Sequence, residues 1–205
     1  VQEFLERHGD DLKLSTEHPV IGLERLIQEP AVNRPGLALA GFFDYFAHMR
    51  VQVLGNSEIS YLDKLSDQVR IERFTKLCEQ DFPCLVVARG HELTAPLREI
   101  ARDRNIAVLN SPRQTMSVLN DATIRLEDEF APRTLLHGCM VDYRGIGVLI
   151  VGPSGAGKSE TAIGLLEKGA ALVADDVVNL KQVGQELSAT AKDFARGYLE
   201  MRGIG

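Results

Sequence analysis

The stretch GIGVLIVGPSGAGKSETAIGLLEKGAALVADD, residues 145–176, decides the fold of the second half of this chain. The aliphatic run Val148–Val151 predicts a strand, the glycine-rich segment Gly152–Gly157 predicts a loop, and Lys158 and Ser159 are expected to open a short helix. This order fits the pattern G-x-x-x-x-G-K-[ST], in which backbone N–H groups and a helix N-terminus surround a phosphate. The predicted phosphate-binding residues are Gly152, Pro153, Ser154, Gly155, Ala156, Gly157, Lys158 and Ser159.

Four residues around this loop are candidates for chemistry on the bound phosphate. Lys158 is expected to place its ammonium group beside the β- and γ-phosphates of a nucleotide, and the Ser159 hydroxyl is expected to bind Mg²⁺. Asp175 and Asp176 follow the apolar run Ala171–Ala174, where a carboxylate can hold a metal or accept a proton from a nucleophile. Asp175 comes only 17 residues after Lys158 (175 − 158). This spacing favours a kinase-like site over a mechanical ATPase or a switch GTPase, although a polar turn after a strand is the alternative interpretation of the two aspartates.

The composition is that of an ordinary globular protein of 205 residues, with 44% hydrophobic and 25% charged residues. A formal net charge of −6 argues against a general nucleic-acid or membrane-surface binder. No apolar run approaches the ~20 residues that a bilayer crossing needs. Cys78, Cys84 and Cys139 form no C-x-x-C pair, and the five histidines show no metal-ligand spacing, so free thiols in a reducing cytoplasm are expected.

The first half of the chain alternates apolar strands with amphipathic helices, which predicts an α/β domain with a mostly parallel sheet. The expected strands are Val51–Leu54, Cys84–Ala88 and Ala107–Leu109, and the expected helices are Val1–His8, Leu37–Phe46, Ser57–Leu65, Val69–Gln80 and Leu97–Arg104. Asn33–Gly36 is interpreted as an exposed turn. A helix after Ser111-Pro112 reaches Phe130 and either connects two domains or packs inside one of them. The predicted domains are residues 1–131 and 132–205.

The second domain is expected to contain a hairpin of Cys139–Asp142 with Val148–Val151, the helix Glu160–Lys168 and the strand Ala171–Ala174. The remainder from Gln182 to Gly205 is interpreted as a tail. This is too little sheet to cover both faces of a nucleotide-binding domain, so we expect a fragment or a disordered remainder. Within the tail, Glu200 and Arg202 would be interpreted as solvated charges from the sequence alone.

Three blocks of the second half resemble the motifs of the bacterial HPr kinase/phosphorylase family. They are HGCMVDYRGIGVLIVGPSGAGKSET (137–161), LVADD (172–176) and LEMRGIG (199–205). The first half resembles the N-terminal domain of the same family in VNRPGLALAGFFDYF (32–46), RVQVLGNSEISYL (50–62) and CLVVARG (84–90). The resemblance implies an N-terminal α/β domain, a connector helix and a P-loop kinase domain similar to phosphoenolpyruvate carboxykinase, without the family's C-terminal third.

The resemblance also implies a bifunctional mechanism on a serine of the phosphocarrier protein HPr, with ATP as co-substrate. Asp175, paired with Asp176, would accept the serine proton in the kinase direction; in reverse it would protonate the leaving serine while inorganic phosphate attacks and pyrophosphate forms. His137 would be a neighbour of the phosphate, and Arg202 would stabilise phosphate charge. Glu200 would complete the Mg²⁺ ligands begun by Ser159. A cytoplasmic homo-hexamer that binds no nucleic acid and no membrane is expected from the family.

One residue departs from the family pattern. Many members have aspartate where this chain has Pro153, and proline lacks an N–H donor and fixes φ, so the choice between ATP and pyrophosphate as donor stays open. Two other functions also remain open. One is a P-loop kinase of a small molecule or a carboxykinase-like enzyme. The other is a nucleotide-sensing module without catalytic activity.

Overall fold

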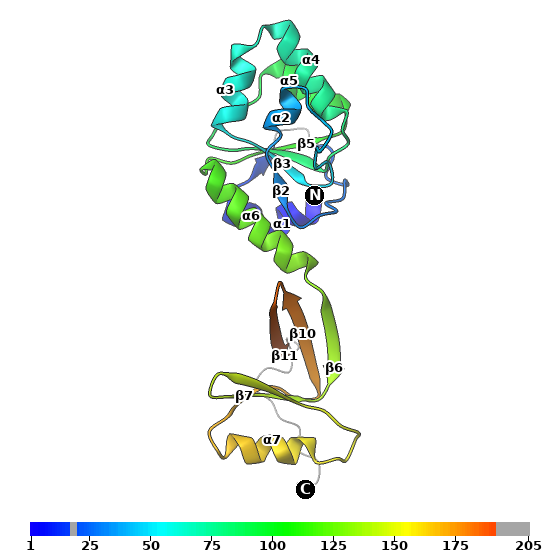
Figure 1. Ribbon diagram of the computed structural model, residues 1–205, viewed down its shortest axis with the longest axis vertical. Helices are drawn as coiled ribbons and strands as arrows, with labels where there is room; N and C mark the ends of the chain where they lie inside the picture. Colours follow the sequence, from blue (N-terminus) through cyan, green and yellow to red (C-terminus); the bar gives the residue numbers. More distant parts are fainter. Residues whose placement is uncertain (17–19, 192–205) are drawn as a thin grey trace. The chain divides into compact units, whose positions relative to one another are not determined.

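The computed structural model describes residues 1–16 and 20–191. It divides the chain into two compact units, Val1–Phe130 (unit 1) and Ala131–Gly205 (unit 2), and each is described by itself (Figure 1). No helix within the described residues combines the length and the apolar composition that a bilayer crossing requires.

Unit 1 is built on a five-stranded sheet in the order β1-β5-β4-β3-β2. Its strands are β1 (Ser15–Thr16), β2 (Val32–Asn33), β3 (Val51–Leu54), β4 (Cys84–Val87) and β5 (Ala107–Asn110). Strands β2 to β5 pair in parallel and β1 pairs antiparallel with β5 at one edge, so the predicted mostly parallel sheet is confirmed. β3 and β4 are buried at every position, which explains their continuous apolar sequences.

Helices cover both faces of this sheet (Figure 1). They are α1 (Gln2–Leu12), α2 (Gly36–Leu39), α3 (Asn56–Lys64), α4 (Asp67–Cys78), α5 (Ala95–Asp103) and α6 (Thr115–Phe130). Leu85 packs in one apolar cluster with residues of α2 to α5, whereas Val86 packs in a second cluster with residues of α1 and α6. Since Val118 and Leu126 of α6 are buried in this second cluster, the helix belongs to the core of unit 1.

Some helix boundaries in unit 1 differ from those predicted. The helix expected over Leu37–Phe46 ends at Leu39, because Gly41 adopts a φ of +102° that is incompatible with a continuing helix. As a consequence Phe42 is 48% exposed rather than buried. Helix α1 does not stop before Gly9 but continues to Leu12 and is ended by the left-handed Lys13. Helix α6 begins at Thr115, a few residues after the predicted start.

The interpretation of Asn33–Gly36 as an exposed turn was wrong. Asn33 lies in β2, and its side-chain amide donates to Oε1 of the buried Gln52 at 2.8 Å. Arg34 donates to Oε2 of Glu58 at 2.8 Å, and the same oxygen accepts the backbone N–H of Gly55 at 2.9 Å. Glu58 is only 4% exposed. The segment is therefore fixed by a buried polar network at the start of α3.

Unit 2 consists of two antiparallel three-stranded sheets and one helix. The elements are β6 (Arg133–His137), β7 (Cys139–Tyr143), β8 (Ile146–Ile150), α7 (Lys158–Leu166), β9 (Ala171–Ala174), β10 (Val177–Val183) and β11 (Glu186–Ala191). The sheets have the orders β8-β7-β9 and β11-β10-β6. Ala162 of α7 packs against Cys139 and Val141 on one face of β7, and Met140 on the opposite face packs against Val178 of the other sheet.

The β7–β8 hairpin, helix α7 and strand β9 confirm the predicted order of elements around the glycine-rich loop. The tail predicted from Gln182 was wrong, because β10 extends to Val183 and pairs with β11. The strands are joined by Gly184 and Gln185, and Gly184 has the positive φ of +59° that such a short connection requires. Glu200 and Arg202 lie outside the described residues.

The buried network around Glu58 predicts a stability effect. Replacing Glu58 by Ala leaves Arg34 and the Gly55 N–H without their shared acceptor, so we expect a loss of about 1–3 kcal/mol in the free energy of unfolding of unit 1. Urea denaturation followed by circular dichroism measures this loss. Glu72→Ala is the control, because Glu72 makes an exposed ion pair with Lys76 on α4. Equal stability of both variants would contradict the role given to Glu58.

Candidate active site

The glycine-rich loop connects β8 to α7 and ends in a left-handed turn. Gly155 has a φ of +80° and Gly157 a φ of +85°, a region that side-chain-bearing residues rarely adopt. Gly157 is the N-cap of α7 and offers no side chain to the N–H groups of the first helical turn. These N–H groups have no acceptor inside the helix, and they carry the positive end of the helix dipole. The loop therefore presents its donors to an anion.

Side chains of the loop and of α7 hold this conformation. The carbonyl oxygen of Pro153 accepts the Lys158 ammonium at 3.0 Å and the Ala156 N–H at 3.2 Å. Thr161 donates through its hydroxyl to the Gly157 carbonyl at 2.8 Å. Pro153, which lacks an N–H donor, thus contributes to the loop through its carbonyl oxygen.

Two turns of the chain contact each other beside the loop. Gly138 connects β6 to β7, and its N–H donates to the carbonyl of Asp176, which connects β9 to β10, at 3.0 Å. A Cβ atom at Gly138 would lie 2.6 Å from the carbonyl oxygen of Ile150, the last residue of β8. Only glycine lets these three backbone segments approach so closely. This contact between Gly138, Asp176 and Ile150 fixes both aspartates relative to the start of the loop.

Asp175 lies at the base of the site and is only 7% exposed. The Cys139 thiol, itself 2% exposed, donates to Asp175 Oδ1 with an Sγ–O distance of 2.5 Å. Burial raises the pKa of the Cys139 thiol, and the hydrogen bond and negative charge of Asp175 raise that pKa further, against smaller lowering effects of the Ser159 side chain and the Asp176 backbone. The thiol therefore stays protonated and remains a donor to the carboxylate.

Asp176 has a different environment from its neighbour. It adopts a left-handed φ of +64° and its side chain is 74% exposed. Its Oδ1 lies 3.8 Å from Nδ1 of His137, whose side chain is 83% exposed. An exposed pair at this distance contributes little to stability. His137 and Asp176 therefore form the rim of the site, whereas Asp175 forms its base.

The loop, the histidine and both aspartates surround one cavity of about 380 Å³, a size in the range of small-molecule sites. Its lining residues are His137, Gly152, Ser154, Gly155, Gly157, Lys158, Ser159, Glu160, Ile163, Asp175 and Asp176. Of the predicted loop residues, Pro153 and Ala156 are not among them. Glu160 and Ile163 of α7 were not predicted, although their positions after Ser159 place them on the first two turns of the helix.

The oxygen atoms around this cavity suit a magnesium ion bound together with a phosphate. Within residues 1–16 and 20–191, no group of three or more histidine, cysteine, aspartate or glutamate side chains is arranged to hold a metal. Mg²⁺ commonly takes one or two carboxylates together with phosphate oxygens and water, so a large protein cage is not required. The Ser159 hydroxyl and the carboxylates of Asp175 and Asp176 supply hard oxygen donors in the same cavity.

Comparison with known proteins gives matches along the whole chain. A family model described as "HPr Serine kinase N terminus" matches residues 1–126, and one described as "HPr Serine kinase C-terminal domain" matches residues 128–205. A Clostridium perfringens protein named "HPr kinase/phosphorylase" is 45% identical over 85% of this chain and 57% of its own length. A protein of the same name from Alkaliphilus metalliredigens is 41% identical over 98% of this chain and 65% of its own length.

These relatives are longer than the matched chain, which spans 57–65% of their lengths. Among solved structures, the "Hpr(Ser) kinase/phosphatase from Coxiella burnetii" is 38% identical. The match covers 35% of this chain and 48% of that chain, with a TM-score of 0.34.

The contact between Cys139 and Asp175 predicts a difference in thiol reactivity. Asp175→Asn removes the negative charge that raises the Cys139 pKa, so native-state alkylation of Cys139 by iodoacetamide at about pH 8 should become faster. Each unit by which the pKa falls raises the thiolate fraction about tenfold. Peptide mass spectrometry over time measures the rate. Asp176→Asn is the matched control and should leave the rate unchanged, because only the Asp176 backbone reaches the thiol. Equal rates in the two variants would contradict the contact.

Proposed function

This chain belongs to the HPr serine kinase family, and we propose that the protein transfers the γ-phosphoryl group of ATP to a serine of the phosphocarrier protein HPr. We further propose that it removes this phosphate by phosphorolysis, in which inorganic phosphate attacks and serine and pyrophosphate are released. The observation that carries the proposal is the shared cavity: the phosphate loop and the buried carboxylate of Asp175 face the same space. The names of the relatives supply the substrate protein.

The loop would bind the phosphates of the nucleotide. The N–H groups at the start of α7 would donate hydrogen bonds to the β-phosphate, and the ammonium of Lys158 would leave the Pro153 carbonyl to contact the β- and γ-phosphates. The N–H groups have fixed positions before the reaction begins, so stabilisation of the phosphoryl charge needs little reorganisation. The proposed binding residues are Gly152, Pro153, Ser154, Gly155, Ala156, Gly157, Lys158 and Ser159.

Asp175 would act as the base for the serine hydroxyl. One of its oxygens accepts the thiol of Cys139, which fixes the orientation of the carboxylate within its buried setting. In the kinase direction the carboxylate would take the hydroxyl proton as the serine oxygen attacks the γ-phosphorus. In the phosphorolysis direction the carboxylate would take a proton from the attacking inorganic phosphate and give it to the leaving serine oxygen. A carboxylate beside the seryl oxygen can serve in both directions because the same bond between this oxygen and phosphorus forms in one reaction and breaks in the other.

Other residues would stabilise charge around the transferred group. His137 and Asp176 at the rim would lie beside the incoming serine or phosphate. Ser159 and Glu200 would hold Mg²⁺, which neutralises phosphate charge when bound, and Arg202 would contact the transferred phosphate. The roles of Glu200 and Arg202 rest on their positions in the motif LEMRGIG, residues 199–205.

Three further properties are part of the proposal. Unit 2 would have the P-loop kinase fold that resembles phosphoenolpyruvate carboxykinase, because its strand–loop–helix–strand order of β8, α7 and β9 positions both the loop and Asp175. The protein would act in the cytoplasm as a homo-hexamer. ATP would be the principal donor, and pyrophosphate would be an alternative donor by reversal of phosphorolysis.

The direct test incubates the protein with HPr, Mg²⁺ and γ-³²P-labelled ATP, followed by phosphopeptide mapping of HPr. We expect label on one HPr serine, and release of labelled pyrophosphate when unlabelled inorganic phosphate is added to the labelled HPr. Labelling of a small metabolite with no label on HPr would identify a small-molecule kinase instead. Nucleotide binding with no transfer at all would leave only a sensing role.

Variants separate the roles of the loop and the base. Asp175→Ala should reduce both transfer and phosphorolysis by at least about 10²-fold, the usual contribution of a general base, while nucleotide binding remains. Lys158→Ala should weaken nucleotide binding as well as transfer. Isothermal calorimetry with ATP and the labelling assay measure the two properties on the same samples. Phosphorolysis at the wild-type rate in Asp175→Ala would remove Asp175 from the chemistry.

A further inference from the structure

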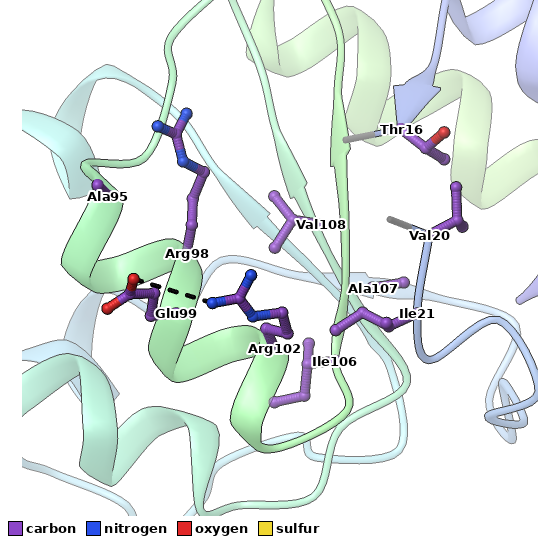
Figure 2. A pocket seen from close by; sticks show the side chains of 10 residues that line it. All are labelled: Thr16, Val20, Ile21, Ala95, Arg98, Glu99, Arg102, Ile106, Ala107 and Val108. Carbon is purple, nitrogen blue, oxygen red and sulfur yellow. Dashed lines mark ion pairs between the residues drawn. The ribbon is translucent and has the colours of Figure 1, made fainter. Parts of the chain in front are cut away.

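The chain has three buried thiols, and one of them differs from the other two. Cys78 and Cys84 lie in the apolar clusters of unit 1, where burial raises the pKa of each to about 12. Cys84 pairs with Ala107 of β5, which Figure 2 labels on its strand. No hydrogen bond joins either thiol to another described residue. Cys139 of unit 2, in contrast, donates to the carboxylate of Asp175.

The strand register brings Cys139 and Asp175 together. Met140 of β7 pairs with Ala174 of β9 in an antiparallel register. The next residues along this register are Cys139 and Asp175, and side chains opposite each other in an antiparallel pair lie on the same face. The thiol reaches Oδ1 of Asp175 with an Sγ–O distance of 2.5 Å. Since both residues are buried, water does not compete for this contact.

The start of α7 covers the same face of β7. Ala162 of α7 packs against Cys139 and Val141. Ser159 precedes Ala162 by three residues, so both lie on the side of α7 that faces β7. The Ser159 side chain and the Asp176 backbone are the other hydrogen-bonding groups that act on the Cys139 sulfur. One thiol therefore joins the first turn of α7 to the turn that follows β9.

Cys139 lies behind the phosphate cavity. Ser159 and Asp175 both line this cavity, whereas Cys139 is not among the described residues that line it. A side chain in this place acts on a bound substrate only through the residues that it holds. Its two contacts are the proposed Mg²⁺ ligand and the proposed base, whose relative placement decides how well the serine oxygen and the phosphoryl group are aligned.

We propose that Cys139 is a positioning residue of the phosphoryl-transfer site, where its thiol fixes the Asp175 carboxylate relative to Ser159. The kinetic consequence of this inference rests on the proposed function, whereas its structural consequence does not. A thiol suits this place because it packs like a small apolar group against Ala162 and still donates a hydrogen bond. Asp175 is the proposed base in both directions, so loss of the thiol affects transfer and phosphorolysis alike.

Two substitutions separate the hydrogen bond from the packing. Cys139→Ser keeps a donor and loses apolar contact, whereas Cys139→Val keeps apolar contact and has no donor. We expect Cys139→Val to lower kcat about tenfold in both directions and to change the KM for HPr and the Kd for ATP less than about twofold, because a misplaced base affects the reacting atoms and not binding. Cys139→Ser should lower kcat less than about threefold, since its hydroxyl can donate to the same oxygen.

Crystal structures of the two variants without nucleotide give a readout that needs no kinase activity. The Asp175 carboxylate should keep its position in Cys139→Ser and rotate away from β7 in Cys139→Val. If the wild-type protein labels no HPr serine, the proposed function fails, and these two structures still decide whether Cys139 positions Asp175.

Cys84→Val is the matched control, because this thiol is also fully buried and no described carboxylate acts on it. The control should transfer phosphate at the wild-type rate, and thermal melting followed by circular dichroism verifies that each variant is folded. Three results would overturn the proposal: a wild-type kcat in Cys139→Val, a slower reaction in Cys139→Ser than in Cys139→Val, or an unmoved Asp175 carboxylate in the valine variant.

Discussion

The hydrogen bond from the Gly138 N–H to the Asp176 carbonyl joins two turns of unit 2, one between β6 and β7 and the other between β9 and β10. The site depends on this contact, because the first turn carries His137 and Cys139 and the second carries both aspartates. The end of β8 packs against these two turns, because Gly138 has no side chain and leaves room for the Ile150 carbonyl. The phosphate loop starts from this strand, so its distance from the carboxylates is set by backbone packing.

Two adjacent aspartates have different chemistry because the chain turns between two sheets at this point. Asp175 follows the last residue of β9 and is buried against Cys139, whereas the left-handed backbone of Asp176 directs its side chain to solvent beside His137. A buried carboxylate with one fixed oxygen has a defined orientation toward the cavity. An exposed carboxylate can adapt to substrates of different shape. This division fits the proposed function, in which the site accepts either a serine hydroxyl or inorganic phosphate.

Local patterns predicted much of this structure. The apolar runs of β3 and β4 predicted the parallel sheet, and the residues from Val148 to Ser159 predicted the order of β8, a glycine-rich turn and α7. The errors arose where a single residue or a long-range contact decides the structure. Gly41 ends α2 within an otherwise helical pattern, and Arg34 is fixed by Glu58, 24 residues away. The hydrogen bond between Cys139 and Asp175 spans 36 residues and follows from the pairing of β7 with β9, for which the residue spacing gives no signal.

In the proposed function, the phosphate loop and Asp175 act on the same phosphoryl group. A crystal structure of the protein with Mg²⁺ and a non-hydrolysable ATP analogue tests it most directly. We predict that the β-phosphate lies within hydrogen-bond distance of the N–H groups from Gly155 to Ser159 and that the γ-phosphate faces the carboxylate of Asp175. A nucleotide bound elsewhere, or a γ-phosphate directed away from Asp175, would contradict the account.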